Sequence, residues 1–440
     1  MTRRVQILWL VVILLGGFVS TGIAADAPAD APAEKAKASQ EDYYELYKVL
    51  VDTVDQVERN YVKEVDRREL IEAAIKGVLG KLDPYSSYIS PEDLGHFRSN
   101  VESEFGGIGI QISVTPGGQL KVLSPLFGTP AYRAGLLAGD RIIEIEGETT
   151  EGTTLEEAVR RLKGKEGTTV KLTVIHPVSN ERIEVEVKRE VIHVDTVMGD
   201  SRKDDDTWDF MLKPEQRIGY VRVQAFSRST AKEIRETLEE LKSAKVRGLI
   251  LDLRFNPGGL LASAIEVSDL FIAKGRIVST KGRRTPERIW DARKPGTYEG
   301  FPMVVLVNHY SASASEIVSA CLQDHKRAVV MGQRTWGKGS VQNVIELEDG
   351  RSALKLTTAS YRRPSGKNID RLSAPKDDDE WGVMPDEGYE LKLSDAELRR
   401  MVEDRRDRDI LRPHEDKPAE EPAEEPAEKP AEKPAEKPAE

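Results

Sequence analysis

Three serines alternate with alanines in the segment 311–316, directly after the apolar run from Met303 to Val307. The apolar run predicts a buried strand, and the residues after the serines predict a helix. A hydroxyl between a strand and a helix is held rigidly, and the first free N–H groups of the helix can stabilise an oxyanion. Serine is also a common helix cap, so the segment fits either a nucleophile or a cap.

Lys338 is a candidate base for such a hydroxyl. It lies between Gly337 and Gly339, and Trp336 before them is expected to help exclude water. An exposed lysine is protonated at neutral pH, whereas burial in apolar surroundings lowers the pKa of the amine by several units. Gln342, four residues further on, is placed to hold the amine in line. The spacing allows a serine–lysine pair, and a lysine on a surface turn is the alternative.

Two successive glycines, Gly258 and Gly259, follow an apolar strand that ends at Arg254. Glycines between a strand and a helix can turn backbone N–H groups outward, where they could form an oxyanion hole with the N–H of Ala314. A simple strand-to-helix turn also fits this sequence.

A glycine cluster at residues 106–109 opens a second candidate site. Backbone N–H groups can converge there on a terminal carboxylate, and the following edge strand can pair with an extended peptide. Alternating apolar residues around one amphipathic helix predict a small barrel with a groove between helix and strand, although a hairpin without ligand also fits. The predicted peptide-binding residues are Gly107, Ile108, Gly109, Ile110, Ile112, Val159 and Leu162.

The rest of the chain contains two further folded patterns. Strands and helices alternate from Arg217 to about Leu393, which predicts a largely parallel sheet covered by helices. Residues 43–82 show helical periodicity with apolar stripes. These stripes fit packing against a second copy of the chain or against the chain itself.

Both ends of the chain have a different composition. Arg3 and Arg4 precede an apolar run over residues 5–19, which is typical of a secretory signal or a membrane anchor. The body is therefore expected to be exported, either to the periplasm or anchored facing outward. Residues 26–39 predict a disordered linker, and Pro-Ala-Glu repeats over residues 418–440 predict an extended tail.

The composition argues against several classes of protein. The net charge is −11, much of it in the acidic tail, which gives no support for nucleic-acid binding. Cys321 is the sole cysteine, and no histidine–carboxylate cluster has ligand spacing, so we expect no disulfide, metal or cofactor. His309 and His325 are the alternative bases of a histidine-dependent hydrolase, but a Gly-x-Ser-x-Gly elbow is missing.

Several segments together resemble the carboxy-terminal processing peptidases, also called tail-specific proteases. The resemblance extends from about Tyr43 to Leu391. It is carried by Asp83-Pro84-Tyr85-Ser86, PDZ-like signatures at 128–136 and 139–147, the segments 251–259, 307–316 and 335–342, and Tyr361 with Pro364-Ser365-Gly366. It implies an α/β multi-domain chain: a crotonase-like peptidase core, an inserted PDZ domain and an N-terminal helical domain.

The resemblance also implies an exported serine endopeptidase that recognises protein C-termini. Ser313 would be the nucleophile, Lys338 the base and Gln342 the residue that orients the base. Ala314 and one of Gly258 and Gly259 would supply the oxyanion donors. The remaining alternative is a PDZ scaffold on an inactive core.

The implied partners are protein or peptide substrates with free C-termini, a second copy of the chain and an adaptor protein. Two departures from the family pattern are Trp336, where phenylalanine is usual, and a charged insertion over residues 373–381.

The expected organisation is a signal or anchor at 1–25, a linker at 26–39, a helical segment at 40–100, a PDZ domain at 101–190, the peptidase core at 191–395, and a helix with the tail at 396–440.

Overall fold

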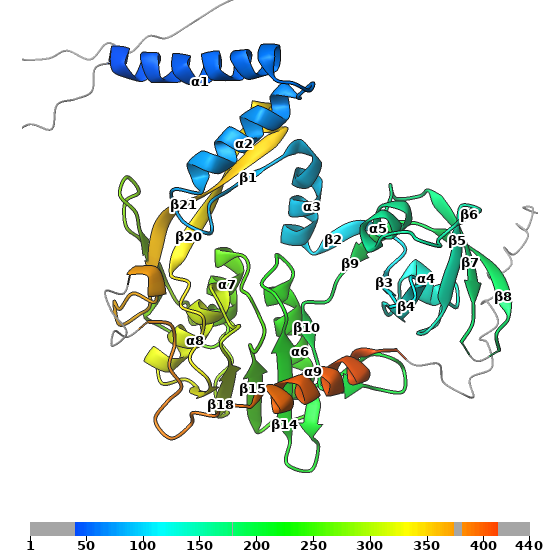
Figure 1. Ribbon diagram of the computed structural model, residues 1–440. Helices are drawn as coiled ribbons and strands as arrows, with labels where there is room; N and C mark the ends of the chain where they lie inside the picture. The colour runs from blue at the N-terminus through cyan, green and yellow to red at the C-terminus, as the bar shows by residue number, and fades with distance from the viewer. Residues whose placement is uncertain (1–39, 178, 374–380, 412–440) are drawn as a thin grey trace, which may run out of the picture. The chain divides into compact units, whose positions relative to one another are not determined.

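The computed structural model describes residues 40–177, 179–373 and 381–411 (Figure 1). The predicted signal or anchor, the linker, the Pro-Ala-Glu tail and most of the charged insertion lie outside these residues. The chain divides into two units, Met1–Ile71 and Glu72–Glu440. Within the described ranges, no helix combines the length and apolar character needed to cross a membrane.

The predicted helical segment near the N-terminus forms two helices, α1 (Gln40–Asn60) and α2 (Arg67–Leu79). Arg67 Nε, at the start of α2, donates to Glu58 Oε2 near the end of α1 at 2.9 Å. Large apolar side chains along α1 are exposed to solvent, among them Tyr43, Tyr44, Leu46, Tyr47, Val49, Leu50 and Val51. Such a row of exposed apolar side chains is typical of a surface that takes part in an interaction.

The predicted small barrel is an antiparallel sheet with one long helix. The strand order is β3 (Ile110–Val114), β4 (Leu120–Pro125), β5 (Arg141–Ile145), β7 (Thr169–Ile175) and β8 (Arg182–Lys188), with β6 (Glu148–Thr149) paired to β5. The helix α5 (Leu155–Leu162) begins after Thr154, whose Oγ1 accepts the Glu157 N–H at 3.2 Å. Short α4 (Pro130–Arg133) and the pair β2 (Glu104–Gly107) and β9 (Glu190–His193) complete this part.

The predicted parallel sheet is confirmed in the second half of the chain. Its parallel strands are β14 (Ile218–Val223), β15 (Gly248–Asp252), β18 (Met303–Val307) and β19 (Val329–Gly332). Antiparallel β10 (Val197–Met198) and β13 (Met211–Lys213) both pair with β14. The core beside this sheet also contains buried residues of α6 (Thr230–Ser243), α7 (Leu261–Asp269) and α8 (Ala314–Asp324), as expected for strands that are apolar on both faces.

A second, antiparallel sheet accompanies the parallel one, and the alternation of strands and helices in the sequence did not predict it. Its strands are β1 (Ser87–Ile89), β21 (Ser352–Arg362), β16 (Arg276–Lys281), β17 (Arg288–Asp291) and β20 (Ser340–Leu347). Helix α8 contacts β16 of this sheet and β19 of the parallel sheet, and it therefore lies between the two (Figure 1). This arrangement brings the start of α8 near the start of β20.

The last described element is the helix α9 (Asp395–Asp409). It begins with a capping box in which Glu397 accepts the Ser394 N–H at 2.8 Å. Near its C-terminal end, the side chain of Arg405 donates to the fully buried carboxylate of Asp252 at the end of β15. The helix is thus joined to the strand that leads into the predicted oxyanion segment.

Candidate active site

A cavity of about 530 Å³ contains the candidate catalytic residues. Ser313, Lys338 and Gln342 line it, and so do the predicted oxyanion residues Ala314 and Gly259. Its other walls are mainly apolar and come from α3 (Pro91–Glu102), the strand ends and α8: Phe97, Val101, Phe226, Leu260, Ile317 and Val344. The tertiary structure therefore gathers residues that lie far apart in the sequence around one mostly apolar space.

The three serines of the 311–316 segment have different surroundings. Ser311 is fully buried and its hydroxyl donates to the carbonyl oxygen of Leu253 at 2.8 Å. Ser315 is also fully buried and donates to the carbonyl oxygen of Asn256 at 3.0 Å. Only Ser313 of the three lines the cavity. The outer two serines hold the neighbouring loop, and the middle one can meet a substrate.

The backbone of Ser313 adopts an unusual conformation, with φ 54° and ψ −111°. A non-glycine residue at positive φ is strained, and such strain persists only where the surroundings impose it. Here the N–H of Ser313 donates to Glu316 Oε2 at 2.8 Å, and its carbonyl oxygen accepts from the hydroxyl of Tyr361 at 3.2 Å. These contacts hold the serine at the sharp turn between strand β18 and helix α8.

Glu316 links the nucleophile segment to the base segment. Its carboxylate is fully buried and accepts hydrogen bonds from Ser313 N, the Thr335 hydroxyl, Gly337 N at 2.7 Å and Lys338 N at 2.9 Å. Burial raises the pKa of Glu316, while the hydrogen bonds that it accepts act in the opposite direction. One side chain therefore sets the main-chain positions of both Ser313 and Lys338.

The amine of Lys338 is half-buried against an aromatic ring. Its Nζ lies 4.7 Å from the centroid of the Tyr85 ring. Burial lowers the pKa of Lys338, and the nearby charge of Lys355 lowers it further, while Glu316 and Asp83 act in the opposite direction. The environment therefore makes the neutral amine easier to reach than in an exposed lysine, which suits a base.

Trp336, which the sequence predicts to help exclude water from Lys338, is 38% exposed. Its Nε1 donates to the Tyr85 hydroxyl at 3.3 Å, and the guanidinium of Arg371 lies 4.9 Å from its ring. Tyr85, from the segment after α2, is the aromatic residue whose ring lies against the amine of Lys338.

Gln342 lies in the cavity, but it does not hold Lys338 in this structure. Its amide nitrogen donates to Ser340 Oγ at 2.9 Å and to Thr357 Oγ1 at 3.1 Å. Thr357 Oγ1 in turn donates to Asp83 Oδ1 at 3.2 Å. The amide therefore belongs to a polar chain beside the lysine.

The two predicted oxyanion glycines have different roles in the structure. Gly258 has φ 104°, and a Cβ atom there would come within 2.8 Å of both Ala312 O and Ser313 Cβ, so only glycine fits this close approach. The N–H of Gly258 donates to the side-chain oxygen of Asn256 at 2.8 Å. Gly259 and Ala314 line the cavity, and Ala314 is the first residue of α8, where helix N–H groups lack intrahelical partners.

The alternative bases lie in other contacts. His309 Nδ1 is 3.2 Å from Gln333 Oε1, and its ring centroid is 3.9 Å from that of Tyr310. His325 Nε2 is 2.7 Å from the carbonyl oxygen of Arg276. Within the part of the chain that the structure describes, neither histidine lines the cavity of Ser313.

The predicted peptide-binding residues lie at one edge of the barrel. Strand β3, which carries Ile110 and Ile112, ends the sheet and contacts α5. Gly109 has φ 77°, and a Cβ atom there would lie 2.4 Å from Thr129 Cβ, so glycine is required. Ile108 and Leu162 belong to the buried core of the barrel, whereas Ile110, Ile112 and Val159 are half-buried, as residues beside a groove would be.

Sequence reasoning assigned no chemical role to three groups beside the catalytic candidates: Glu316, Tyr85 and Lys355. Glu316 stands inside the serine segment, where the capping-box spacing from Ser313 could have indicated it. Tyr85 and Lys355 are far from the serine in the sequence, and only the fold places them near Lys338.

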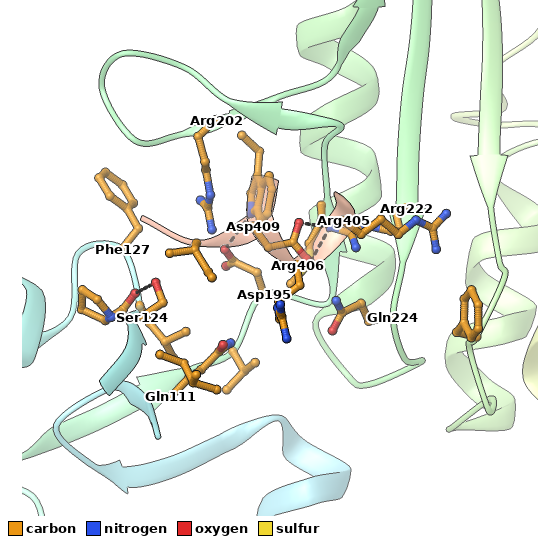
Figure 2. Close-up of a pocket in the computed structure, with 18 of the residues that line it drawn as sticks. Gln111, Ser124, Phe127, Asp195, Arg202, Arg222, Gln224, Arg405, Arg406 and Asp409 are labelled. Atoms are coloured by element: carbon orange, nitrogen blue, oxygen red, sulfur yellow. Dashed lines mark hydrogen bonds and ion pairs between the residues drawn. The ribbon is translucent and has the colours of Figure 1, made fainter. Parts of the chain in front are cut away.

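Figure 2 shows a second cavity, of about 440 Å³, that lies apart from the catalytic candidates. Gln111 and Ser124 line it together with four arginines, Arg202, Arg222, Arg405 and Arg406. None of the described residues that line it is a candidate nucleophile or base. The candidate nucleophile and base lie instead in the cavity of Ser313.

Comparisons with known proteins agree with the site. Residues 217–387 match the model of "Peptidase family S41", residues 122–175 match the "PDZ domain", and residues 13–93 match the "Activating protease CtpB N-terminal domain". The peptidase and PDZ matches fall on the two-sheet core and on the small barrel. The chain thus combines an S41 peptidase core with a PDZ domain and an N-terminal domain.

Individual proteins similar to this chain are named as C-terminal processing proteases. A carboxy-terminal-processing protease of Bartonella bacilliformis is 38% identical over 81% of this chain and 81% of its own length. A carboxyl-terminal-processing protease of Synechocystis is 36% identical over 76% of this chain and 74% of its own length. The solved photosystem II D1 C-terminal processing protease is 28% identical, covers 78% of this chain and 92% of its own, and has a TM-score of 0.43.

The match to the Bartonella protein extends over most of both chains, and the family models account for the core and the PDZ domain separately. The chain therefore belongs to the carboxy-terminal processing proteases of peptidase family S41, which are serine-type endopeptidases.

Proposed function

We propose that this protease is exported, holds the C-terminus of a protein substrate in its PDZ groove, and cleaves the substrate with Ser313 as nucleophile and Lys338 as base. The observation that carries the proposal is the shared cavity. Of the three candidate serines, only Ser313 lines it, and the lysine with a lowered pKa lines it too.

The chemistry would follow the acyl-enzyme route. Ser313 Oγ attacks the carbonyl carbon of the scissile bond while its proton passes to the neutral amine of Lys338. The oxyanion that forms accepts hydrogen bonds from the N–H groups of Ala314 and Gly259. Lys338 then protonates the leaving amine, and a water molecule hydrolyses the ester with the lysine again as base.

Gly259 is the better candidate of the glycine pair for this role. The N–H of Gly258 already donates to Asn256, whereas Gly259 lines the cavity beside Ala314. A donor that is committed to another acceptor would have to break that bond before it could stabilise the oxyanion.

The side chains of Lys338 and Gln342 must both rotate before the reaction. Lys338 Nζ lies over the Tyr85 ring, and Gln342 donates to Ser340 and Thr357. Catalytic hydrogen bonds are often long in the absence of substrate and tighten in the complex. A rotation of the lysine side chain toward Ser313 would complete the pair, and a rotation of Gln342 would let its amide oxygen accept from the amine.

The experiment that tests the proposal uses a defined unfolded substrate with an apolar free C-terminus, whose products are identified by mass. The wild-type protein should cleave it, and Ser313→Ala and Lys338→Ala should each abolish cleavage while both still bind the substrate. Cleavage by Lys338→Ala that disappears in His309→Ala would refute the lysine assignment. Binding without cleavage by the wild-type protein would favour the scaffold alternative.

The PDZ domain is proposed to switch activity on when it binds a substrate tail. Removal of residues 105–188 should therefore change both the rate and the choice of substrate. If the shortened protein cleaves the same substrates at the same rate, the PDZ domain has no such coupling.

Export and association complete the proposal. The positively charged start and the apolar run over residues 5–19 support export, with cleavage as a signal or retention as an anchor. The exposed apolar side chains of α1 support self-association or the binding of an adaptor protein. Light scattering gives the mass of the protein with and without residues 40–60. A lower number of copies in the shortened protein would show that this segment holds the copies together.

A further inference from the structure

A second lysine lines the cavity of Ser313. Lys355 stands on β21, where it pairs with Val344 of β20 and with Ser87 of β1. It is half-buried. In the described part of the chain, its ammonium group has neither an ion-pair partner nor a hydrogen-bond partner. Its charge is therefore available to a group that enters the cavity.

The acidic groups near Lys338 are committed elsewhere. The Asp83 carboxylate accepts from Tyr85 N at 2.8 Å, from Ser86 N at 2.9 Å and from the hydroxyls of Ser86 and Thr357. Glu316 is fully buried and already accepts four hydrogen bonds. Neither carboxylate lines the cavity.

The cavity is therefore positively charged. Its charged lining residues, within the described ranges, are Lys338 and Lys355, and no aspartate or glutamate is among them. The other walls are largely apolar, which weakens solvent screening and strengthens any ion pair that forms inside. In the proposed mechanism Lys338 is neutral when it acts as a base, so that Lys355 keeps a positive charge that the reaction does not use.

We propose that Lys355 determines specificity by binding a carboxylate of the substrate close to the scissile bond. The inference rests on the proposed catalytic role of Ser313. The carboxylate is either the side chain of an aspartate or glutamate, or the terminal carboxylate of a substrate that ends shortly after the cleaved bond. The substrate residues beside this carboxylate are apolar, since most of the remaining wall is apolar.

A different role for Lys355 gives a different pattern. If its charge acts only on Lys338, its removal changes the cleavage of every substrate by the same factor. If it also binds a substrate carboxylate, its removal slows acidic substrates by a larger factor than neutral ones. The ratio between matched substrates therefore separates the two roles.

The test uses the full chain and a neutral peptide that the wild-type protein cleaves. Glutamate, glutamine or lysine is placed in turn at each of the three positions on either side of the scissile bond, in peptides with an amidated C-terminus. A second set carries a free carboxylate one to three residues after the bond. The kcat/KM of each peptide is measured for the wild-type protein, Lys355→Met, Lys355→Arg, Lys355→Glu and the control Lys281→Met, which removes an exposed charge outside the cavity.

The wild-type protein should cleave the acidic peptide at one of these positions roughly 10- to 100-fold better than its glutamine counterpart. Lys355→Met should abolish that ratio. It should also slow all peptides by a common factor at low pH, because the pKa of Lys338 rises when the charge of Lys355 is removed. Lys355→Arg should retain the ratio, and Lys355→Glu should favour the lysine peptide. The set that responds, amidated or free, identifies the source of the carboxylate. Lys281→Met should behave as the wild-type protein.

Two results would overturn the inference. One is a wild-type protein that does not distinguish acidic from neutral peptides at any tested position. The other is a Lys355→Met variant that keeps the wild-type ratio between acidic and neutral peptides. Cleavage of the neutral peptide by Ser313→Ala would instead refute the proposed catalytic mechanism, whatever the result for Lys355.

Discussion

The main chain of Lys338 is bound to the side chain of Glu316, because its N–H donates to Glu316 Oε2 at 2.9 Å. The same oxygen accepts the N–H of Ser313 at 2.8 Å. Two segments that are more than twenty residues apart in the sequence thus meet at one atom. This buried carboxylate therefore holds the main chains of the proposed nucleophile and base in a fixed relation.

Glu316→Gln is expected to lower kcat/KM roughly 100-fold and to reduce the free energy of unfolding by about 1–3 kcal/mol. The amide keeps the shape of the side chain but turns one acceptor oxygen into an NH₂ group that faces other donors. Steady-state kinetics and thermal unfolding measure the two effects. Glu266→Gln, on the exposed face of α7, is the control and should change neither. Activity of Glu316→Gln within twofold of the wild-type value would contradict this role.

The three serines should respond differently to alanine substitution. Ser313→Ala should lose at least about 10⁴-fold in kcat/KM with an unchanged melting temperature, since it removes the nucleophile but no buried hydrogen bond. Ser315→Ala should lower the free energy of unfolding by about 1 kcal/mol and still cleave, because its hydroxyl bonds Asn256 O. Parallel activity and melting measurements check both. An active Ser313→Ala protein would mean that another residue is the nucleophile.

The pH dependence of kcat/KM should follow the protonation of Lys338. Below its pKa the amine is protonated and cannot act as a base, so activity should rise with pH. Because burial and the charge of Lys355 lower the pKa of Lys338, this rise should occur below the range of an ordinary lysine. Asp83→Asn removes a charge that raises this pKa, so the rise should move to lower pH. A shift to higher pH in Asp83→Asn would contradict the assignment.

The C-terminal helix should stabilise the core through Arg405. Its guanidinium donates to Asp252 and, at 3.3 Å, to the Tyr220 hydroxyl, and the Asp252 side chain is 0% exposed. Arg405→Met should lower the free energy of unfolding by about 3 kcal/mol, because a buried carboxylate loses one of its partners. Arg406→Met is the matched control: the Arg406 side chain is 65% exposed, and its loss should have no measurable effect. Denaturant unfolding measures the free energy of unfolding of the two variants. Equal values would show that Arg405 does not stabilise the core.

Local patterns in the sequence predicted the elements well. The apolar run at 303–307 and the amphipathic segment at 155–162 became β18 and α5 with the expected type. Such predictions succeed because side-chain periodicity depends on near neighbours along the chain. The second sheet was not predicted, since β1 and β16 pair with β21 across long separations that no local pattern encodes.

The candidate site shows the same division. Residue types and spacing established by themselves that a serine segment, a glycine-flanked lysine and a glycine pair were present, and the resemblance to a family named Ser313. Only the tertiary structure decided that Ser311 and Ser315 donate to buried carbonyl groups, that Tyr85 covers Lys338, and that Lys355 enters the cavity. The reason is physical: the three serines have nearly the same neighbours in sequence, and their different environments arise from strands and loops that the fold brings from distant parts of the chain.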